Sequence, residues 1–137
     1  MSEASITLTS DEQTTLRTAA YGAVTLLSMT RPGPISSTRQ NMAGALTLTS
    51  ATGLVGQILS AKEKTALKGK NTAEVAEEVL PALTEAVAIL DTKAPAETAE
   101  FQRAVTAAIQ EAIAATSGSN QAQDDMATKI TAALQGS

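Results

Sequence analysis

The sequence predicts an all-α protein, a compact bundle of five or six helices joined by short loops. Alanine, which has the highest intrinsic helix propensity, occurs 27 times in the 137 residues. The eight glycines and four prolines lie mostly where helices are expected to end. No long run alternates apolar and polar residues as a half-buried strand does. We therefore expect one helical domain over residues 10–137, preceded by a flexible N-terminal arm over residues 1–9.

The composition excludes several kinds of chemistry. The chain has no cysteine and no histidine, which removes thiol nucleophiles, the commonest general base and the commonest transition-metal ligand. It contains neither a phosphate-binding loop nor a nucleophile motif. A net charge of −4 disfavours nucleic acid, whose binding rests on neutralising phosphates. We expect a protein that is not an enzyme, needs no cofactor or metal and does not bind nucleic acid.

The first helix is expected to begin at Ser10, because Gln13 follows it at the spacing of a capping box. It should end near Met29, since the prolines and glycine of residues 31–34 cannot continue it. At 100° per residue, one face of this helix is apolar and is expected to be buried. That face consists of Leu16, Ala19, Ala20, Ala23, Val24, Leu26 and Leu27. The residues on or beside the opposite face are Arg17, Thr18, Tyr21, Thr25 and Ser28.

The next helix, capped by Ser36 or Ser37, leads into residues 40–61, twenty-two positions without a charged side chain. Either one long helix runs through this stretch, buried on nearly every side, or the helix breaks around residues 47–50 and restarts with Ser50 as N-cap. The break is favoured, because Thr and Ser compete for backbone hydrogen bonds and prefer caps to helix interiors. Met42 and Leu46 point one way. A second apolar face, rotated by more than a quarter turn from them, consists of Leu48, Ala51, Leu54, Val55, Ile58 and Leu59.

A strongly amphipathic helix should begin at Asn71 or Thr72 and end before a turn at residues 91–94. Pro81 lies on its polar face, so we expect one kinked helix with the proline outward. Its apolar stripe consists of Val75, Ala76, Val79, Leu80, Leu83, Ala86, Val87 and Leu90. Its polar face carries Glu74, Glu77, Glu78 and Glu85. Carboxylates that point away from the core favour a solvated face over a metal site.

Two further helices complete the predicted bundle. Pro95 suits the first position of the next helix, which residues 117–119 should end. Its apolar stripe consists of Phe101, Ala104, Val105, Ala108, Ile109, Ala112 and Ile113. The last helix has Asn120 as its expected cap, with Gln123 three positions later. Its expected buried residues are Ala122, Met126, Ile130, Ala133 and Leu134.

The uncharged stretch must be hidden in a membrane, in the bundle or against another copy of the chain. Seven Asn, Gln, Ser and Thr residues and three glycines within residues 41–60 disfavour a membrane span. The stretch and the apolar stripes offer more low-polarity surface than a small bundle with two aromatic residues easily encloses. We therefore expect a homo-oligomer, a dimer first, with an unidentified protein partner as a further possibility. The interface candidates are Met42, Leu46, Leu54 and Ile58.

A lysine-rich loop follows the uncharged stretch, and Gly69 marks it as a connection. Its four lysines are Lys62, Lys64, Lys68 and Lys70, which are candidates for anion binding because clustered ammonium groups raise the local potential. The nearby Glu63, Glu74, Glu77 and Glu78 favour instead a solvated loop whose charges are balanced.

The predicted function is non-enzymatic self-association or contact with other proteins. The alternative is a carrier of a small apolar ligand that sits between helices, where Thr49, Thr52 and Gln57 would orient it. The N-terminal segment MSEASITLTSDEQ has neither a basic region nor an apolar core of a signal peptide, so we expect a cytoplasmic protein.

Three segments together resemble a family of small, uncharacterised bacterial all-helical proteins. These segments are AAYGAVTLLSMTRPG, ALTLTSATGLVGQIL and EVLPALTEAVAIL. The resemblance extends over nearly the whole chain and implies an all-helical fold. The family has no established activity or cofactor, so the resemblance assigns no functional residue.

Overall fold

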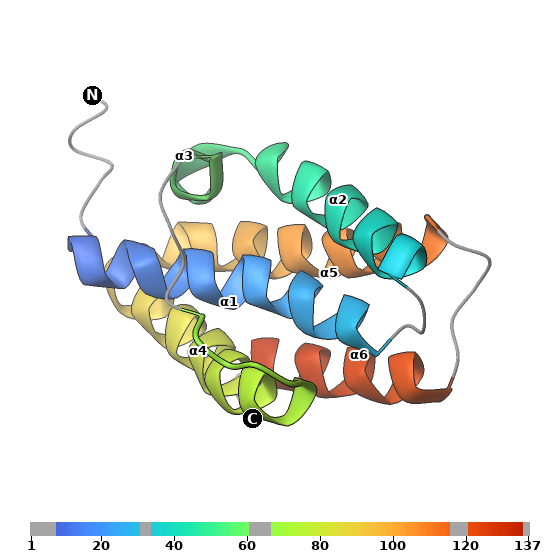
Figure 1. Ribbon diagram of the computed structural model, residues 1–137. Coiled ribbons are helices and arrows are strands. Elements are labelled where there is room, and N and C mark those ends of the chain that lie inside the picture. The colour runs from blue at the N-terminus through green and yellow to red at the C-terminus, as the bar shows by residue number, and fades with distance from the viewer. Residues whose placement is uncertain (1–7, 31–33, 61–66, 116–120, 136–137) are drawn as a thin grey trace.

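Six α-helices and one short 3₁₀ helix make up the part of the chain that the computed structural model describes, residues 8–30, 34–60, 67–115 and 121–135 (Figure 1). Within those ranges there is no strand, which confirms the all-α prediction. The helices are α1 (Ser10–Met29), α2 (Pro34–Thr49), α3 (Gly53–Ser60), α4 (Thr72–Lys93), η2 (Pro95–Glu97), α5 (Thr98–Ala114) and α6 (Gln121–Leu134). None of these helices is long and apolar enough to cross a membrane.

Helix α1 is the centre of the bundle. It contacts each of the other five α-helices, with α2 and α5 on one side and α4 and α6 on the other (Figure 1). All seven residues of its predicted apolar face are buried. Arg17, Thr18 and Ser28, which were expected on or beside a polar face, are buried too. The expectation was wrong for these three residues because neighbouring helices cover much of this side of α1, whereas Tyr21 and Thr25 of the same predicted face are partly exposed.

Helix α1 begins at Ser10 and ends at Met29, as predicted, but its capping box lies one residue earlier than expected. Thr9 is the N-cap: its Oγ1 accepts a hydrogen bond from Glu12 N–H, and Glu12 Oε1 accepts one from Thr9 N–H. This reciprocal pair is a capping box, shifted from the predicted Ser10 and Gln13. Leu8 is buried against the core. Two residues of the predicted arm thus belong to the folded domain, and residues 1–7 lie outside the described part.

Helix α2 begins at Pro34, before both predicted caps, Ser36 and Ser37. Proline suits a first helical position because its missing N–H needs no partner there. Further along, Gly44 faces α1 so closely that a Cβ there would lie 2.5 Å from Val24 Cγ1. The missing side chain lets α2 lie directly on α1, and this contact fixes which face of α2 points outward.

The predicted break in the uncharged stretch is confirmed. The restart is two residues later than expected, because a helix capped by Ser50 would begin at residue 51 and α3 begins at Gly53. Gly53 opens α3 with a φ of +69°, a conformation that favours glycine. Carboxylates of η2 and α5 accept hydrogen bonds from backbone N–H groups at the N-terminus of α3. Glu100 accepts a hydrogen bond from Thr52 N–H (3.0 Å), and Glu97 accepts one from Val55 N–H (3.2 Å). Anions at a helix N-terminus also interact favourably with the helix dipole.

Helix α4 begins after Asn71, whose side chain accepts a hydrogen bond from Glu74 N–H, as predicted. Pro81 is exposed within it, and the helix continues as one element through Lys93. The turn predicted at residues 91–94 is therefore wrong over its first three residues. Pro95 does begin the next helical segment, although as η2, which leads directly into α5.

The C-terminal helix α6 buries four of its five predicted residues. Met126, Ile130, Ala133 and Leu134 are buried, whereas Ala122 is exposed. Gln123 is buried in its place. The predicted cap Asn120 and the break at residues 117–119 lie outside the described part.

Candidate self-association surface on α2

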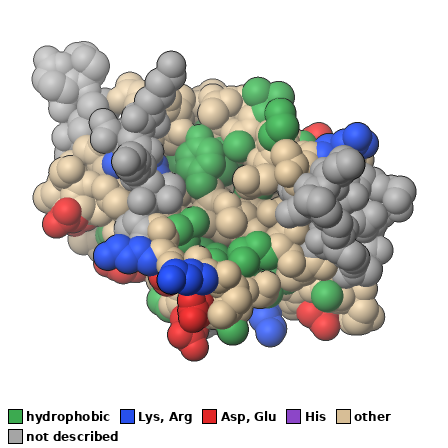
Figure 2. Space-filling view, viewed as in Figure 1, with side chains coloured by type: hydrophobic (Ala, Val, Ile, Leu, Met, Phe, Trp, Pro, Cys, Tyr) green, Lys and Arg blue, Asp and Glu red, His purple; other side chains and the backbone are tan. Residues whose placement is uncertain are grey.

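The outer face of α2 carries the two large hydrophobic side chains that are exposed in the described part of the chain. Met42 is 69% exposed and Leu46 is 73% exposed. Figure 2 shows hydrophobic side chains reaching the surface along the upper edge of the molecule, over α2. The other large aliphatic residues of the neighbouring helices are buried or half-buried. This face therefore leaves apolar surface in water that the bundle itself does not cover.

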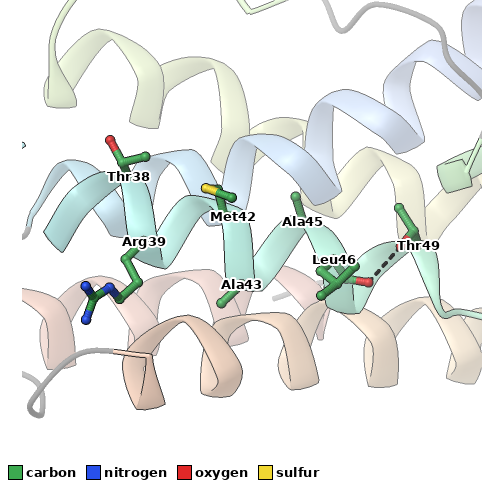
Figure 3. A pocket seen from close by; sticks show the side chains of 7 residues that line it. All are labelled: Thr38, Arg39, Met42, Ala43, Ala45, Leu46 and Thr49. Carbon is green, nitrogen blue, oxygen red and sulfur yellow. Dashed lines mark hydrogen bonds between the residues drawn. The ribbon is translucent and has the colours of Figure 1, made fainter. Parts of the chain in front are cut away.

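An open groove of about 970 Å³ runs along this side of the helix. We call its lining residues the α2 face: Thr38, Arg39, Met42, Ala43, Ala45, Leu46 and Thr49. Figure 3 shows that their side chains form two rows, one on each side of the helix axis. Ala43 and Ala45 lie at the outer edges of the two rows, so their small side chains leave room beside Met42 and Leu46 for the side chains of a second helix.

The position of Gly44 explains why this face points outward. With 100° between successive residues, Met42 and Leu46 lie about 160° to either side of Gly44. Because Gly44 packs on Val24 of α1, the opposite side of α2 faces solvent. The same contact that docks α2 on the core thus exposes the two apolar residues.

The α2 face is almost free of charge. The chain carries 14 acidic residues, yet none lies between Glu12 and Glu63. Arg39 is the one charged residue of α2, and it belongs to neither of the two ion pairs found within the described ranges. Two copies of this acidic protein would meet here without carboxylates of α2 opposing one another.

Two of the four predicted interface residues do not belong to this surface. Leu54 and Ile58 are buried in the chain's own core, at 4% and 3% exposure. The prediction is corrected for them because α3 folds back on α1, to which Tyr21 fixes it by donating a hydrogen bond to Leu59 O. Among the candidates, Met42 and Leu46 are the pair that the fold brings together on one surface.

The predicted lysine cluster is only partly described. Lys62 and Lys64 lie outside the described residues, and Lys68 and Lys70 are exposed. The backbone N–H groups of the latter two donate to acidic side chains of α4: Lys68 N to Glu78 Oε1 and Lys70 N to Glu74 Oε1, both 2.9 Å. These contacts place negative charge beside the loop, which favours the solvated loop with balanced charges over an anion-binding site.

The residues proposed for a carrier do not share a cavity. Thr49, Thr52 and Gln57 are all exposed. Thr49 lines the α2 groove, whereas two smaller hollows, of about 370 and 110 Å³, lie beside α6. Neither Thr52 nor Gln57 lines any of these three. Within the described ranges no group of acidic residues is placed to hold a metal ion either.

Sequence reasoning missed a polar contact in the core. Gln40 and Gln123 are completely buried and exchange hydrogen bonds through their amides, Gln123 Nε2 to Gln40 Oε1 at 2.7 Å and Gln40 Nε2 to Gln123 Oε1 at 3.3 Å. Gln123 Nε2 also donates to Leu27 O (3.2 Å), which links α6 to α1. A glutamine in a helical pattern is ordinarily assigned to the surface, so no signal in one sequence identifies such a pair.

One carboxylate beside the α2–α3 junction has a strongly perturbed acidity. Hydrogen bonds from Arg103, and then from the backbone of Thr52, lower the pKa of Glu100 to about 2. Arg103 donates from Nε at 2.9 Å and from Nη2 at 2.6 Å. The charged form of Glu100 therefore holds the junction together, which is a structural role.

Comparisons with family models, with curated proteins and with solved structures find no match to this chain. The resemblance to small bacterial helical proteins accordingly stays a prediction.

Proposed function

We propose that this protein is a non-enzymatic helical protein that acts by self-association, as a dimer whose interface is the α2 face. The observation that carries the proposal is the exposure of Met42 and Leu46 on an otherwise well-packed bundle. Burying a side chain of this size stabilises by roughly 1.5–3 kcal/mol, and a symmetric dimer buries each residue twice. In such a dimer, Met42 and Leu46 of each copy bury the same two residues of the other copy.

The charge distribution supports a second copy over a charged partner. A strongly charged ligand or protein needs complementary charge, and α2 offers only Arg39. The acidic residues of the chain lie on other segments, so carboxylates of α2 do not repel each other when two copies meet on this face. Two-fold dimers are also the commonest form of soluble oligomer. The hollows found along the described residues do not favour a carrier, because the α2 groove is open to solvent and none of the three is lined by more than one of Thr49, Thr52 and Gln57. A cytoplasmic location stays a prediction.

The test compares a double substitution with a matched control. M42S/L46S removes both apolar side chains and adds no charge. A88S/A132S makes the same kind of change at two exposed alanines of α4 and α6. We expect the first variant to raise the dimer Kd at least about a hundredfold, as measured by sedimentation, because four buried side chains are lost. The control should associate like the wild type.

The opposite result would remove the proposal. If M42S/L46S and A88S/A132S associate equally, the α2 face is not the interface. Both variants should unfold within about 1 kcal/mol of the wild type in urea, because the changed side chains are exposed in the monomer and only the lower helix propensity of serine is felt. Loss of association is thereby distinguished from loss of fold.

A further inference from the structure

The exposed face of α2 is nearly symmetric about Gly44. Counting outward from Gly44, Ala43 corresponds to Ala45 and Met42 to Leu46. Five positions out, Arg39 corresponds to Thr49. In an isologous two-fold interface a residue that contacts a second position of the partner is contacted in return by that position's counterpart. An antiparallel pair centred at Gly44 would in this way pair apolar Met42 with apolar Leu46 and small Ala43 with small Ala45.

We propose that two copies pair their α2 helices in antiparallel orientation about a two-fold axis opposite Gly44, with Arg39 of each copy beside the last turn of its partner's α2. This inference rests on the proposed self-association and specifies its geometry. Each Met42 then packs against the partner's Leu46 at the same height along the helix pair. The alanines at 43 and 45 flank these contacts and permit close approach of the two backbones.

Arg39 decides between the two possible orientations. In the antiparallel pair its guanidinium lies at the height of residues 46–49 of the partner copy, the C-terminal turn of α2. A helix C-terminus carries a partial negative charge, and a cation there is stabilising. In a parallel pair the two Arg39 side chains would instead face each other as like charges. The only charge on the helix therefore favours the antiparallel arrangement.

Two nitroxide labels measure the orientation directly, because the natural chain has no cysteine. At 1.5 Å per residue, the antiparallel pair separates two labels at T38C by about 18 Å along the helix axis and two labels at A45C by about 3 Å. A parallel pair gives no axial separation at either site. Electron paramagnetic resonance should find a long distance for T38C and a short distance for A45C. Similar short distances at both sites would overturn the antiparallel geometry.

The role of Arg39 has its own test. T49E places a carboxylate where the antiparallel pair brings the partner's Arg39, so it should lower the dimer Kd about fivefold at low salt. The same substitution in an R39Q background should give no gain, and about 0.5 M NaCl should cancel the gain in the first case. Weaker association of T49E in both backgrounds would contradict the placement of Arg39.

The proposed self-association and the proposed antiparallel pairing can be contradicted by different results. A wild-type chain that sediments as a monomer removes both the proposed function and this geometry. A dimer that depends on Met42 and Leu46 yet gives equal label distances retains the function and overturns the antiparallel pairing.

Discussion

Gln40 of α2 and Gln123 of α6 form a reciprocal amide pair in the core, with both side chains completely buried. Because Gln123 also donates to Leu27 O of α1, it joins α6 to two helices whose contacting residues lie 83 and 96 positions earlier in the sequence. An amide pair is directional, unlike the aliphatic contacts around it. It therefore fixes the rotation of α2, and with it the face that α2 turns outward.

Replacing one member of this pair should cost more than replacing both. Q40L leaves the Gln123 amide without its partner on α2, and we expect a loss of about 1–3 kcal/mol in the free energy of unfolding. Q40L/Q123L removes the unsatisfied group and should be less destabilised than the sum of the single variants. Urea denaturation of the wild type, both single variants and the double variant measures this coupling. Additive losses would show that the amides do not act together.

The contact between Gly44 and Val24 makes a second prediction. G44A puts a Cβ 2.5 Å from Val24 Cγ1 in a fully packed region, so α2 must shift outward. We expect a loss of about 1–3 kcal/mol by overpacking, even though alanine has the higher helix propensity. G44A/V24A should recover part of the loss by making room. Urea denaturation showing G44A as stable as the wild type would contradict the close approach of α1 and α2.

The pKa of Glu100 predicts how stability depends on pH. Because Arg103 and Thr52 lower its pKa from 4.5 to about 2, the charged carboxylate stabilises the fold at all pH values above 4.5. That contribution should be lost as the pH falls from 4.5 towards 2. E100Q should flatten the acid side of a plot of unfolding free energy against pH, whereas E111Q, at an exposed position on the same helix, serves as the control. Parallel acid profiles for E100Q and the wild type would rule out this role.

The fold class and most of the buried stripes could be predicted because helical periodicity records them locally. The stripe of α4 and the apolar face of α1 came directly from residue spacing. What the sequence did not reveal is what surrounds each helix. Arg17 and Ser28 lie on the weakly polar side of α1, and only the arrangement of five neighbours around that helix buries them.

The candidate surface on α2 was likewise predictable in part from the sequence and decided in part by long-range packing. The uncharged stretch predicts that residues 40–61 need cover from water, and the break predicted within it is confirmed between α2 and α3. Yet Met42 and Leu54 are both large apolar residues of the uncharged stretch, and one is exposed whereas the other is buried. Their difference comes from long-range contacts, Gly44 on Val24 and Tyr21 on Leu59, which turn α2 outward and α3 inward. Such contacts leave no periodic signal.

Sedimentation of the wild-type chain over a wide concentration range tests the central claim most directly. An interface made mainly by one helix pair is at the small end of the range for specific complexes, so we expect a Kd on the order of 10–100 µM. The weight-average mass should rise from 14.0 kDa in dilute solution towards twice that value as the concentration passes the Kd. A mass of 14.0 kDa at every concentration up to about ten times that Kd would contradict self-association through the α2 face.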